Sequence, residues 1–542
     1  MTVTRSKLFL VFATLVASML FLSLAGCSDP GVDLPAERML NRGLGSAPDS
    51  FDPQKARTVQ SGTVLRDIGE PLLTYTATGE LTGGVAEAWS ISDDGLVYTF
   101  TLRSDARWSN GEPVTADDFV YSFRRLVDPA AALFYAKSAS PIEHYAEIIA
   151  GDREPTELGV RAVDERRLEI RLNEVTPYFL LLLTHTSLQP IYAPGIERHG
   201  DAFARPGNLV TNGPYRLVHA DPASLVVIER NPYYWNAAAT AIDKVSYHVL
   251  TQPAAQYNRY RAGELDITDN VPAESFASIR EAYPDELRVA PTLGTYYYGF
   301  NLTKPPFAGN RDLRAALSLA IDREVLVERI TGRGEAPAYS FVPPGIPDYE
   351  PPQLPFANLS QTERNERARR LYFAAGYSED NPARIELRYN TSDTHHRIAE
   401  AVEAMWREAL GVETVLINEE FQVLLENMRA REVTQVFRSA WNGDYLDAQT
   451  FLAIQESANA SNFTGFANEE YDGLMQRAAA QTDPDTRRRF LEEAERVLLA
   501  EHALIPLYYY VSKHLVSQDI EGWHDTILDY HYSHHLSFRS PD

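Results

Sequence analysis

The chain has almost no cysteine, since Cys27 is the only one among its 542 residues. An intrachain disulfide is therefore excluded, even in an oxidising compartment. A chain of this length can bury enough hydrophobic core to be stable without one, and its length predicts two or three domains.

Positive charge is also scarce relative to negative charge. Lys and Arg total 50 against 75 for Asp and Glu, which gives a formal net charge of −25. Nucleic acid and anionic membrane surfaces bind basic proteins, so this balance argues against both as partners.

Long hydrophobic runs are absent except at the N-terminus, where Leu8 to Ala25 follow Arg5 and Lys7. This pattern is typical of a secretory signal. The run ends in Leu24-Ala25-Gly26-Cys27, which resembles the lipobox of bacterial lipoproteins; the alternative is an ordinary anchoring helix. We expect residues 1–27 to be a lipoprotein signal peptide. The rest would be water-soluble, in the periplasm or cell envelope, and held to a membrane only by a lipid on Cys27.

Three segments outline the middle of the chain. Val97 to Leu102 alternate after a Ser-Asp-Asp-Gly turn, which predicts a strand with one buried face. Asn310 to Ile330 show helical spacing and stop before Gly332, which predicts one amphipathic helix. Seven prolines between Pro337 and Phe356 predict an irregular arm.

The stretch 384–444 has the pattern of alternating strands and helices. The predicted elements are a strand at 385–389, a helix ending before Gly411, a strand at 415–417, a helix at 421–431 and a strand at 433–437. A β-α-β-α-β unit forms a parallel sheet, whose ligands bind beyond the carboxyl ends of the strands. The loops 390–395 and 438–444 should therefore face one cleft.

The second of these loops combines a cation, an anion and two aromatic residues within 438–445. Asp444, beside Trp441, could accept an ammonium group, and Arg438 could bind a carboxylate at the other end of the ligand. A zwitterion would satisfy both. The alternative interpretation makes Asp444 a turn or cap residue and Arg438 a surface side chain.

Between about Arg66 and Leu515 the chain resembles the oligopeptide-binding proteins of bacterial ABC importers, in the peptide and nickel branch of extracellular solute-binding proteins, family 5. The matching segments are 84–89 (GVAEAW), 118–126 (DFVYSFRRL), 211–215 (TNGPY), 229–232 (ERNP), 295–298 (TYYY), 337–340 (PAYS) and 389–393 (YNTSD). The resemblance implies an α/β, three-domain, two-lobed periplasmic binding protein fold of class II, cluster C, with mixed sheets and a hinge that closes over an extended peptide.

The resemblance also implies roles for individual residues. Asp444 would bind the peptide ammonium group with Trp441 at the same end, while Arg438, Arg429 and His395 would meet the carboxylates of peptides of different length. Tyr135 would form an aromatic wall. Peptide main chain would lie along 296–301, which includes Tyr298, and along 439–443, which includes Gly443, adding as a strand does.

This chain departs from the family pattern at some positions. Gly299 and Ser61 stand where the family has acidic pocket residues, so a preference for lysine-rich peptides is not carried over. Phe421 stands near a pocket tryptophan of the family, and one residue is inserted before Arg429.

The implied domains are I (28–73, 192–293 and 509–542), II (74–191, a β-rich insertion) and III (294–508). The chain crosses between the lobes near Gly294 and Tyr509, which would form the hinge. The implied protein is a monomer that carries short peptides to the transmembrane subunits of an ABC permease, without a cofactor.

Other functions remain open. Relatives of this fold carry nickel, metal chelates or haem, and histidines cluster at 395–396 and at His531, His534 and His535, although without thiolates or a known ligand spacing. An enzyme is not expected, because the sequence has no His-Glu-x-x-His, Gly-x-Ser-x-Gly or phosphate-loop motif. An adhesin or a sensor could use the same cleft.

Overall fold

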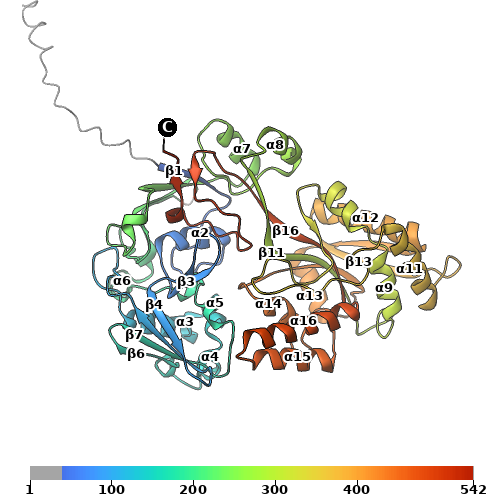
Figure 1. The fold of residues 1–542 in the computed structure, drawn as a ribbon, viewed down its shortest axis with the longest axis horizontal. Helices are drawn as coiled ribbons and strands as arrows, with labels where there is room; N and C mark the ends of the chain where they lie inside the picture. The colour runs from blue at the N-terminus through green and yellow to red at the C-terminus, as the bar shows by residue number, and fades with distance from the viewer. Residues whose placement is uncertain (1–38, 222, 541–542) are drawn as a thin grey trace, which may run out of the picture. The chain divides into compact units, whose positions relative to one another are not determined.

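The computed structural model describes residues 39–221 and 223–540 (Figure 1). The predicted signal peptide, Cys27 and the beginning of predicted domain I lie outside the described residues. Within the described part of the chain, no helix is both long enough and apolar enough to span a bilayer.

A four-stranded sheet begins with the first described strand and has the order β1-β10-β9-β8. Its strands are β1 (Met39–Leu44), β10 (Lys244–Val249), β9 (Leu225–Arg230) and β8 (Tyr215–Asp221). Helix α2 (Val59–Ile68) buries Val64, Leu65 and Ile68 in the core of this sheet. The helix starts at Thr58, whose side chain accepts a hydrogen bond from the backbone N–H of Ser61.

A second sheet, β4-β5-β7-β6, is antiparallel throughout and lies within the predicted insertion 74–191. Its strands are β4 (Ala86–Ile91), β5 (Val97–Leu102), β7 (Arg167–Arg171) and β6 (Val160–Asp164). The bounds of β5 confirm the predicted strand, and Tyr98, Phe100 and Leu102 are its buried face. Helix α3 (Ala116–Leu126) packs Phe119 and Phe123 into the same core.

The third sheet has six strands in the order β12-β16-β11-β15-β13-β14. They are β12 (Ala336–Pro337), β16 (Leu504–Leu515), β11 (Leu287–Phe300), β15 (Val436–Asn442), β13 (Arg384–Asn390) and β14 (Glu413–Glu419). β13 is parallel to both β14 and β15, which confirms the predicted β-α-β-α-β unit. The other pairs in this sheet are antiparallel, so the sheet is mixed.

The predicted end of the third strand of this unit was wrong. β15 runs from Val436 to Asn442, so most of the segment predicted as a loop at 438–444 belongs to the strand. The reason is its long-range partner, because β11 pairs with β15 from Gly294↔Asn442 to Phe300↔Val436.

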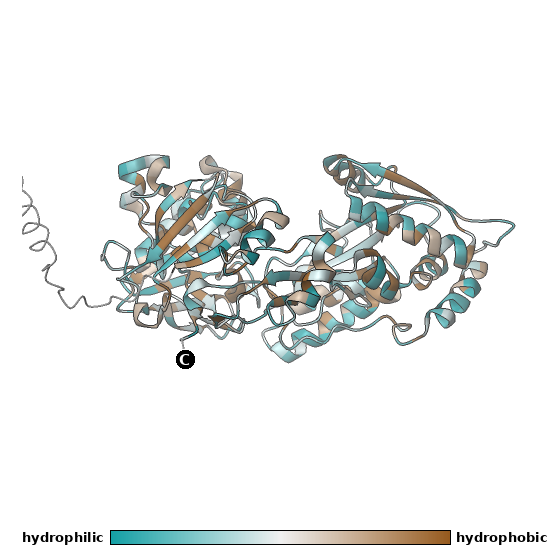
Figure 2. Ribbon diagram, turned by 90° about the horizontal axis from the view of Figure 1, so that it is seen from above, coloured by the Kyte–Doolittle hydropathy of each residue, from teal (hydrophilic) through white to brown (hydrophobic). Residues whose placement is uncertain are grey.

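Helices accompany the third sheet. α12 (Asp393–Leu410) buries Ile398, Val402 and Trp406, and it ends at Gly411, whose positive φ of 73° suits a residue without Cβ. The indole N–H of Trp406 donates to the Leu317 carbonyl at 2.9 Å. The others are α9 (Arg311–Leu319), α11 (Gln361–Ala374), α13 (Phe421–Ala430), α14 (Gln449–Leu452), α15 (Glu469–Ala479) and α16 (Pro484–Ala500). In Figure 2 the helices carry both teal and brown residues, as amphipathic helices do.

The single helix predicted for 310–330 is interrupted. α9 ends at Leu319, a short helix α10 (Arg323–Val325) follows, and residues 326–331 form a π-helical turn. Asp322 starts the new helix by accepting from the Val325 N–H. Arg323 then turns inward and donates to the carbonyls of Ala338 and Pro506, a pairing that the apolar periodicity could not reveal.

The proline-rich arm comes directly after β12. It has no helix between 338 and 356, which agrees with the predicted irregular structure. Buried Glu495 holds it in place, because its carboxylate accepts hydrogen bonds from the backbone N–H groups of Phe341 and Val342 and from the Tyr349 hydroxyl. The arm is therefore irregular but anchored in the core.

The two long strands β11 and β16 contain the predicted hinge positions Gly294 and Tyr509. They pair with each other on both sides of an irregularity between Pro291 and Thr295. The division into three domains and the hinge stay predictions.

Candidate ligand-binding site

Arg438 lies in β15 among neutral partners. Its guanidinium group donates to the side-chain oxygen of Asn390 at 3.2 Å and to the Tyr510 hydroxyl at 3.1 Å, and it lies 4.8 Å from the centre of the Tyr296 ring. Its Nε is buried and has no hydrogen-bond partner among the described residues. None of these groups is an anion, so the charge of Arg438 is available to an anionic ligand.

The contact with Asn390 shows that the carboxyl end of β13 lies beside Arg438, the third residue of β15. His395, near the beginning of α12, belongs to the same group, because its Nδ1 lies 3.2 Å from the Tyr296 hydroxyl. Burial and the nearby charge of Arg438 lower the pKa of His395 to about 4. His395 is therefore neutral at pH 7 and offers a hydrogen bond, not a charge, to a ligand.

Asp444 lies just beyond β15. Its backbone N–H donates to the Thr450 hydroxyl at 3.2 Å, and the indole N–H of Trp441 donates to the same hydroxyl at 3.4 Å. Burial raises the pKa of Asp444, and the charge of Lys137 opposes that rise. Among the described residues the carboxylate forms no ion pair within 4.0 Å, and the residue as a whole is exposed to solvent.

Tyr135 lies on a different segment, in the turn Phe134–Ala139, and its ring centre is 4.6 Å from that of His185. Burial raises the pKa of the Tyr135 hydroxyl, and the charge of Asp444 adds to the rise. The structure thus brings Tyr135 into the electrostatic neighbourhood of Asp444, although 309 positions separate them in the sequence.

Two cavities each have one predicted site residue in their lining, Tyr135 or Gly443, whereas Asp444, Arg438 and His395 line neither. One, of about 160 Å³, is lined by Tyr135, Thr58 and His185, and the other, of about 380 Å³, is lined by Asn442, Gly443 and the segment 527–532. Val59, Arg66 and Tyr530 line both cavities, so the two lie side by side, and we refer to them together as the recess between Tyr135 and Gly443. Larger cavities of about 500 and 770 Å³ are lined by none of the predicted site residues.

Gly443 has no space for a side chain, since a Cβ there would lie 2.6 Å from Leu293 and 3.0 Å from Thr450. Gly299 is similar, since a Cβ would lie 2.4 Å from the Phe437 ring, and an acidic side chain has no space there. Ser61 is buried and donates to Asp49 at 2.6 Å, so it does not face the recess.

Two predicted residues lie apart from this group. Arg429 is on α13, is 53% exposed and pairs with Glu426 at 3.2 Å. Tyr298 is fully buried, and its hydroxyl has no hydrogen-bond partner among the described residues. Their contacts with a ligand stay predictions.

The backbone of β11 is not free to receive another strand, contrary to the expectation for 296–301. β15 occupies one of its edges and β16 the other. β15 differs, because in the described chain β13 pairs with it only at Val436 and Phe437. Its edge from Ser439 to Asn442 therefore remains open for main-chain hydrogen bonds.

The sequence alone did not indicate Val59, Arg66, Lys137 or Tyr530. Arg66 is held 3.9 Å from the centre of the Tyr530 ring, and Val59 is 74% exposed on the first turn of α2. No sequence pattern could have indicated them, since α2 and the C-terminal segment are remote in the sequence and meet only in the folded chain.

Comparison with known proteins gives a consistent result. Residues 80–463 match the family described as bacterial extracellular solute-binding proteins, family 5 Middle. The chain is 39% identical over 524 residues to the periplasmic oligopeptide-binding protein OppA of Escherichia coli K12, with 96% of each chain covered.

Solved structures are similar over nearly the whole chain. The unliganded open form of the periplasmic murein tripeptide-binding protein MppA matches with a TM-score of 0.86 and 35% identity, covering 93% of this chain and 98% of the other. Haemophilus influenzae OppA in complex with RPPGFSPFR matches with a TM-score of 0.73 and 36% identity, covering 93% and 99%. These similarities confirm the predicted two-lobed periplasmic binding fold.

Proposed function

This chain belongs to the bacterial extracellular solute-binding proteins of family 5, and from that premise we propose that it captures short peptides outside the cytoplasm and delivers them to an ABC importer. The observation that carries the proposal is the arrangement of β15, which has a free cation at Arg438, an open backbone edge from Ser439 to Asn442, and the unpaired carboxylate of Asp444 just beyond its end.

The spacing of the two charges favours a peptide over a single amino acid. Arg438 and Asn442 both belong to β15, in which the chain advances about 3.4 Å per residue, so their Cα atoms lie about 14 Å apart, and Asp444 follows two positions later. A zwitterion that reaches both charges therefore needs several residues, about three to six.

Main-chain pairing with β15 would make recognition independent of side-chain identity. The ammonium group of the peptide would bind Asp444. Its carboxylate would bind Arg438 or, in peptides of other lengths, His395 or Arg429. The recess between Tyr135 and Gly443 would hold side chains near the ammonium end. The activity is capture and release, since the family consists of solute-binding proteins.

Three further features belong to the proposal. The protein would be held to a membrane by a lipid on Cys27, would act as a monomer, and would close by rotation of predicted domain III about the crossings near Gly294 and Tyr509. The resemblance to lipoproteins and to the peptide-binding family supports these features.

Calorimetry on protein freed of carried ligand by unfolding and refolding tests the proposal. We expect trialanine and tetraalanine to bind and alanine to show no measurable heat. Binding of alanine as tight as that of the peptides, or no binding of any peptide from two to six residues, would refute it.

A further inference from the structure

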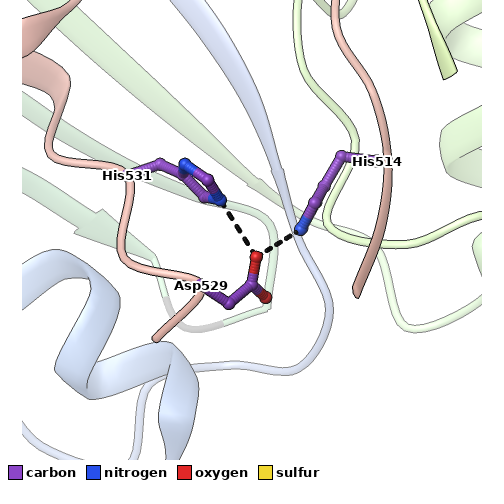
Figure 3. A group of neighbouring side chains, drawn as sticks. All are labelled: His514, Asp529 and His531. Carbon is purple, nitrogen blue, oxygen red and sulfur yellow. Dashed lines mark hydrogen bonds and ion pairs between the residues drawn. The ribbon is translucent and has the colours of Figure 1, made fainter. Parts of the chain in front are cut away.

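Two imidazole rings contact one carboxylate oxygen at the edge of the cavity of about 380 Å³. The Nε2 atoms of His514 and His531 each lie 2.9 Å from Oδ1 of Asp529 (Figure 3). The three ligand atoms all lie within 4.8 Å of one another. The group therefore offers a metal ion two nitrogen ligand atoms and one oxygen ligand atom.

The outer contacts fix which atoms face that point. His514 Nδ1 lies 2.9 Å from the Thr268 carbonyl, which can only accept, so Nδ1 carries a hydrogen. The His514 ring therefore presents Nε2 to Asp529. A hydrogen bond from the remote ring nitrogen to a carbonyl is the usual way in which a metal-binding histidine is oriented.

This arrangement requires a proton or a metal ion between each Nε2 and the carboxylate; without a metal, His514 is an imidazolium, because both of its ring nitrogens face acceptors, and His531 can donate as a neutral ring. A neutral Nε2 with a lone pair would be repelled by Oδ1 at 2.9 Å, so the site holds either protons or a cation. Arg42 does not meet this need, because its guanidinium group donates to the His531 carbonyl and to the Ser533 hydroxyl and lies 4.0 Å from Asp67.

The rings are rigidly held and the carboxylate is accessible. His531 stacks on Trp523 with ring centres 3.6 Å apart, and the His514 ring lies 5.2 Å from the same indole. The side chains of His514 and His531 are only 10% and 6% exposed, whereas that of Asp529 is 33% exposed. All three line the cavity of about 380 Å³, which leaves space for a water ligand.

We infer that His514, Asp529 and His531 form a binding site for a divalent transition metal of the zinc class. Two imidazoles and a carboxylate suit Zn²⁺, Ni²⁺ or Cu²⁺ better than Mg²⁺ or Ca²⁺, which prefer oxygen. Tetrahedral Zn²⁺ needs its ligand atoms about 3.3 Å apart. Each of the two Nε2–Oδ1 distances of 2.9 Å therefore has to lengthen by a few tenths of an ångström. The protons on the two Nε2 atoms are released when the metal binds.

A bound cation would connect β16, which carries His514, to the C-terminal segment that carries Asp529 and His531. The three residues line the cavity that the proposed function assigns to peptide side chains, but none of them is proposed to bind a peptide charge, so the inference does not depend on peptide binding.

The test is calorimetric titration of ZnCl₂ into the chelator-treated full chain without a histidine tag. We expect one Zn²⁺ per chain, and loss of affinity by at least about tenfold in His531→Gln and in Asp529→Asn. His535→Gln is the matched control, because His535 lies in the same C-terminal segment outside the cluster, and it should bind as the wild type does.

Thermal unfolding with and without ZnCl₂ provides a second readout that also shows whether each variant is folded. Zn²⁺ should raise the melting temperature of the wild type and of His535→Gln, and leave that of His531→Gln unchanged. The inference is overturned if the wild type binds no Zn²⁺ at 100-fold excess, or if folded His531→Gln and Asp529→Asn bind it unchanged.

Discussion

The rings of Tyr178 and Tyr445 stack face to face, with centres 4.7 Å apart and planes within 5° of parallel. Tyr178 lies in the predicted domain II, directly before α5 (Phe179–Leu182), and Tyr445 directly follows Asp444. The stack therefore joins the insertion to the end of the site that carries the carboxylate.

We expect Tyr178→Ala to weaken the binding of a free tripeptide by about 2- to 12-fold, because an aromatic pair contributes about 0.5–1.5 kcal/mol beyond its buried area. Tyr178→Phe keeps the ring and should bind as the wild type does. Titration calorimetry of the three proteins measures this effect. Equal affinity of wild type and Tyr178→Ala would show that the stack has no part in binding.

The affinity for peptides should rise with pH across the acid range. Burial raises the pKa of Asp444 in the free protein, and a bound ammonium group would lower it. Between the two pKa values the free protein holds more protons than the complex, so binding releases protons and strengthens as pH increases. Titrations between about pH 4 and pH 6 in buffers of different ionisation enthalpy measure the release. Proton uptake on binding would contradict the assignment.

Arg438 and His395 should affect peptides of different length. An extended peptide advances about 3.3 Å per residue, so its carboxylate meets a different group as it grows. Arg438→Ala should weaken one length most. His395→Ala should weaken a longer class by a smaller factor, because the lowered pKa leaves His395 uncharged at pH 7.

Alanine peptides of two to five residues, titrated against both variants, the wild type and Arg429→Ala, provide the comparison. Uniform losses at every length would mean that these residues do not read the carboxyl end.

Cys27→Ser should release the protein from membranes or leave its precursor unprocessed, because Cys27 is the only thiol available for a lipid. Cell fractionation and the mass of the mature protein test this expectation. The same mature mass and the same membrane fraction in the variant would exclude lipidation at Cys27.

The sequence predicted the local elements well where one periodicity and one terminator coincided. β5 has a clear alternation after a turn, and α12 has an apolar face that ends at Gly411. Predictions were wrong where a distant partner decided the outcome. β15 continues to Asn442 because β11 pairs with it, and the helix from 310 breaks where Arg323 binds the carbonyls of Ala338 and Pro506.

The residues of the candidate site also differ in whether the sequence could indicate them. Asp444, Trp441 and Arg438 could be found because they lie within one short segment and resemble a known family. Arg66 and Tyr530 could not, since they meet only after the chain folds, and neither lies in a recognisable motif. The sequence predicted that His395 and Arg438 face one cleft, but the lowered pKa of His395 also depends on its burial, which the sequence did not indicate.

The most direct test of the account compares Asp444→Asn with the wild type, using a tripeptide with a free amino group and the same tripeptide N-acetylated. For the wild type, we expect acetylation to abolish most of the binding. Asp444→Asn should lose about 2 to 4 kcal/mol toward the free tripeptide, as when one partner of a desolvated charge pair is removed. Asp152→Asn, at an exposed turn, serves as the control. If the wild type binds both tripeptides equally well, Asp444 does not hold the ammonium group and the central claim is wrong.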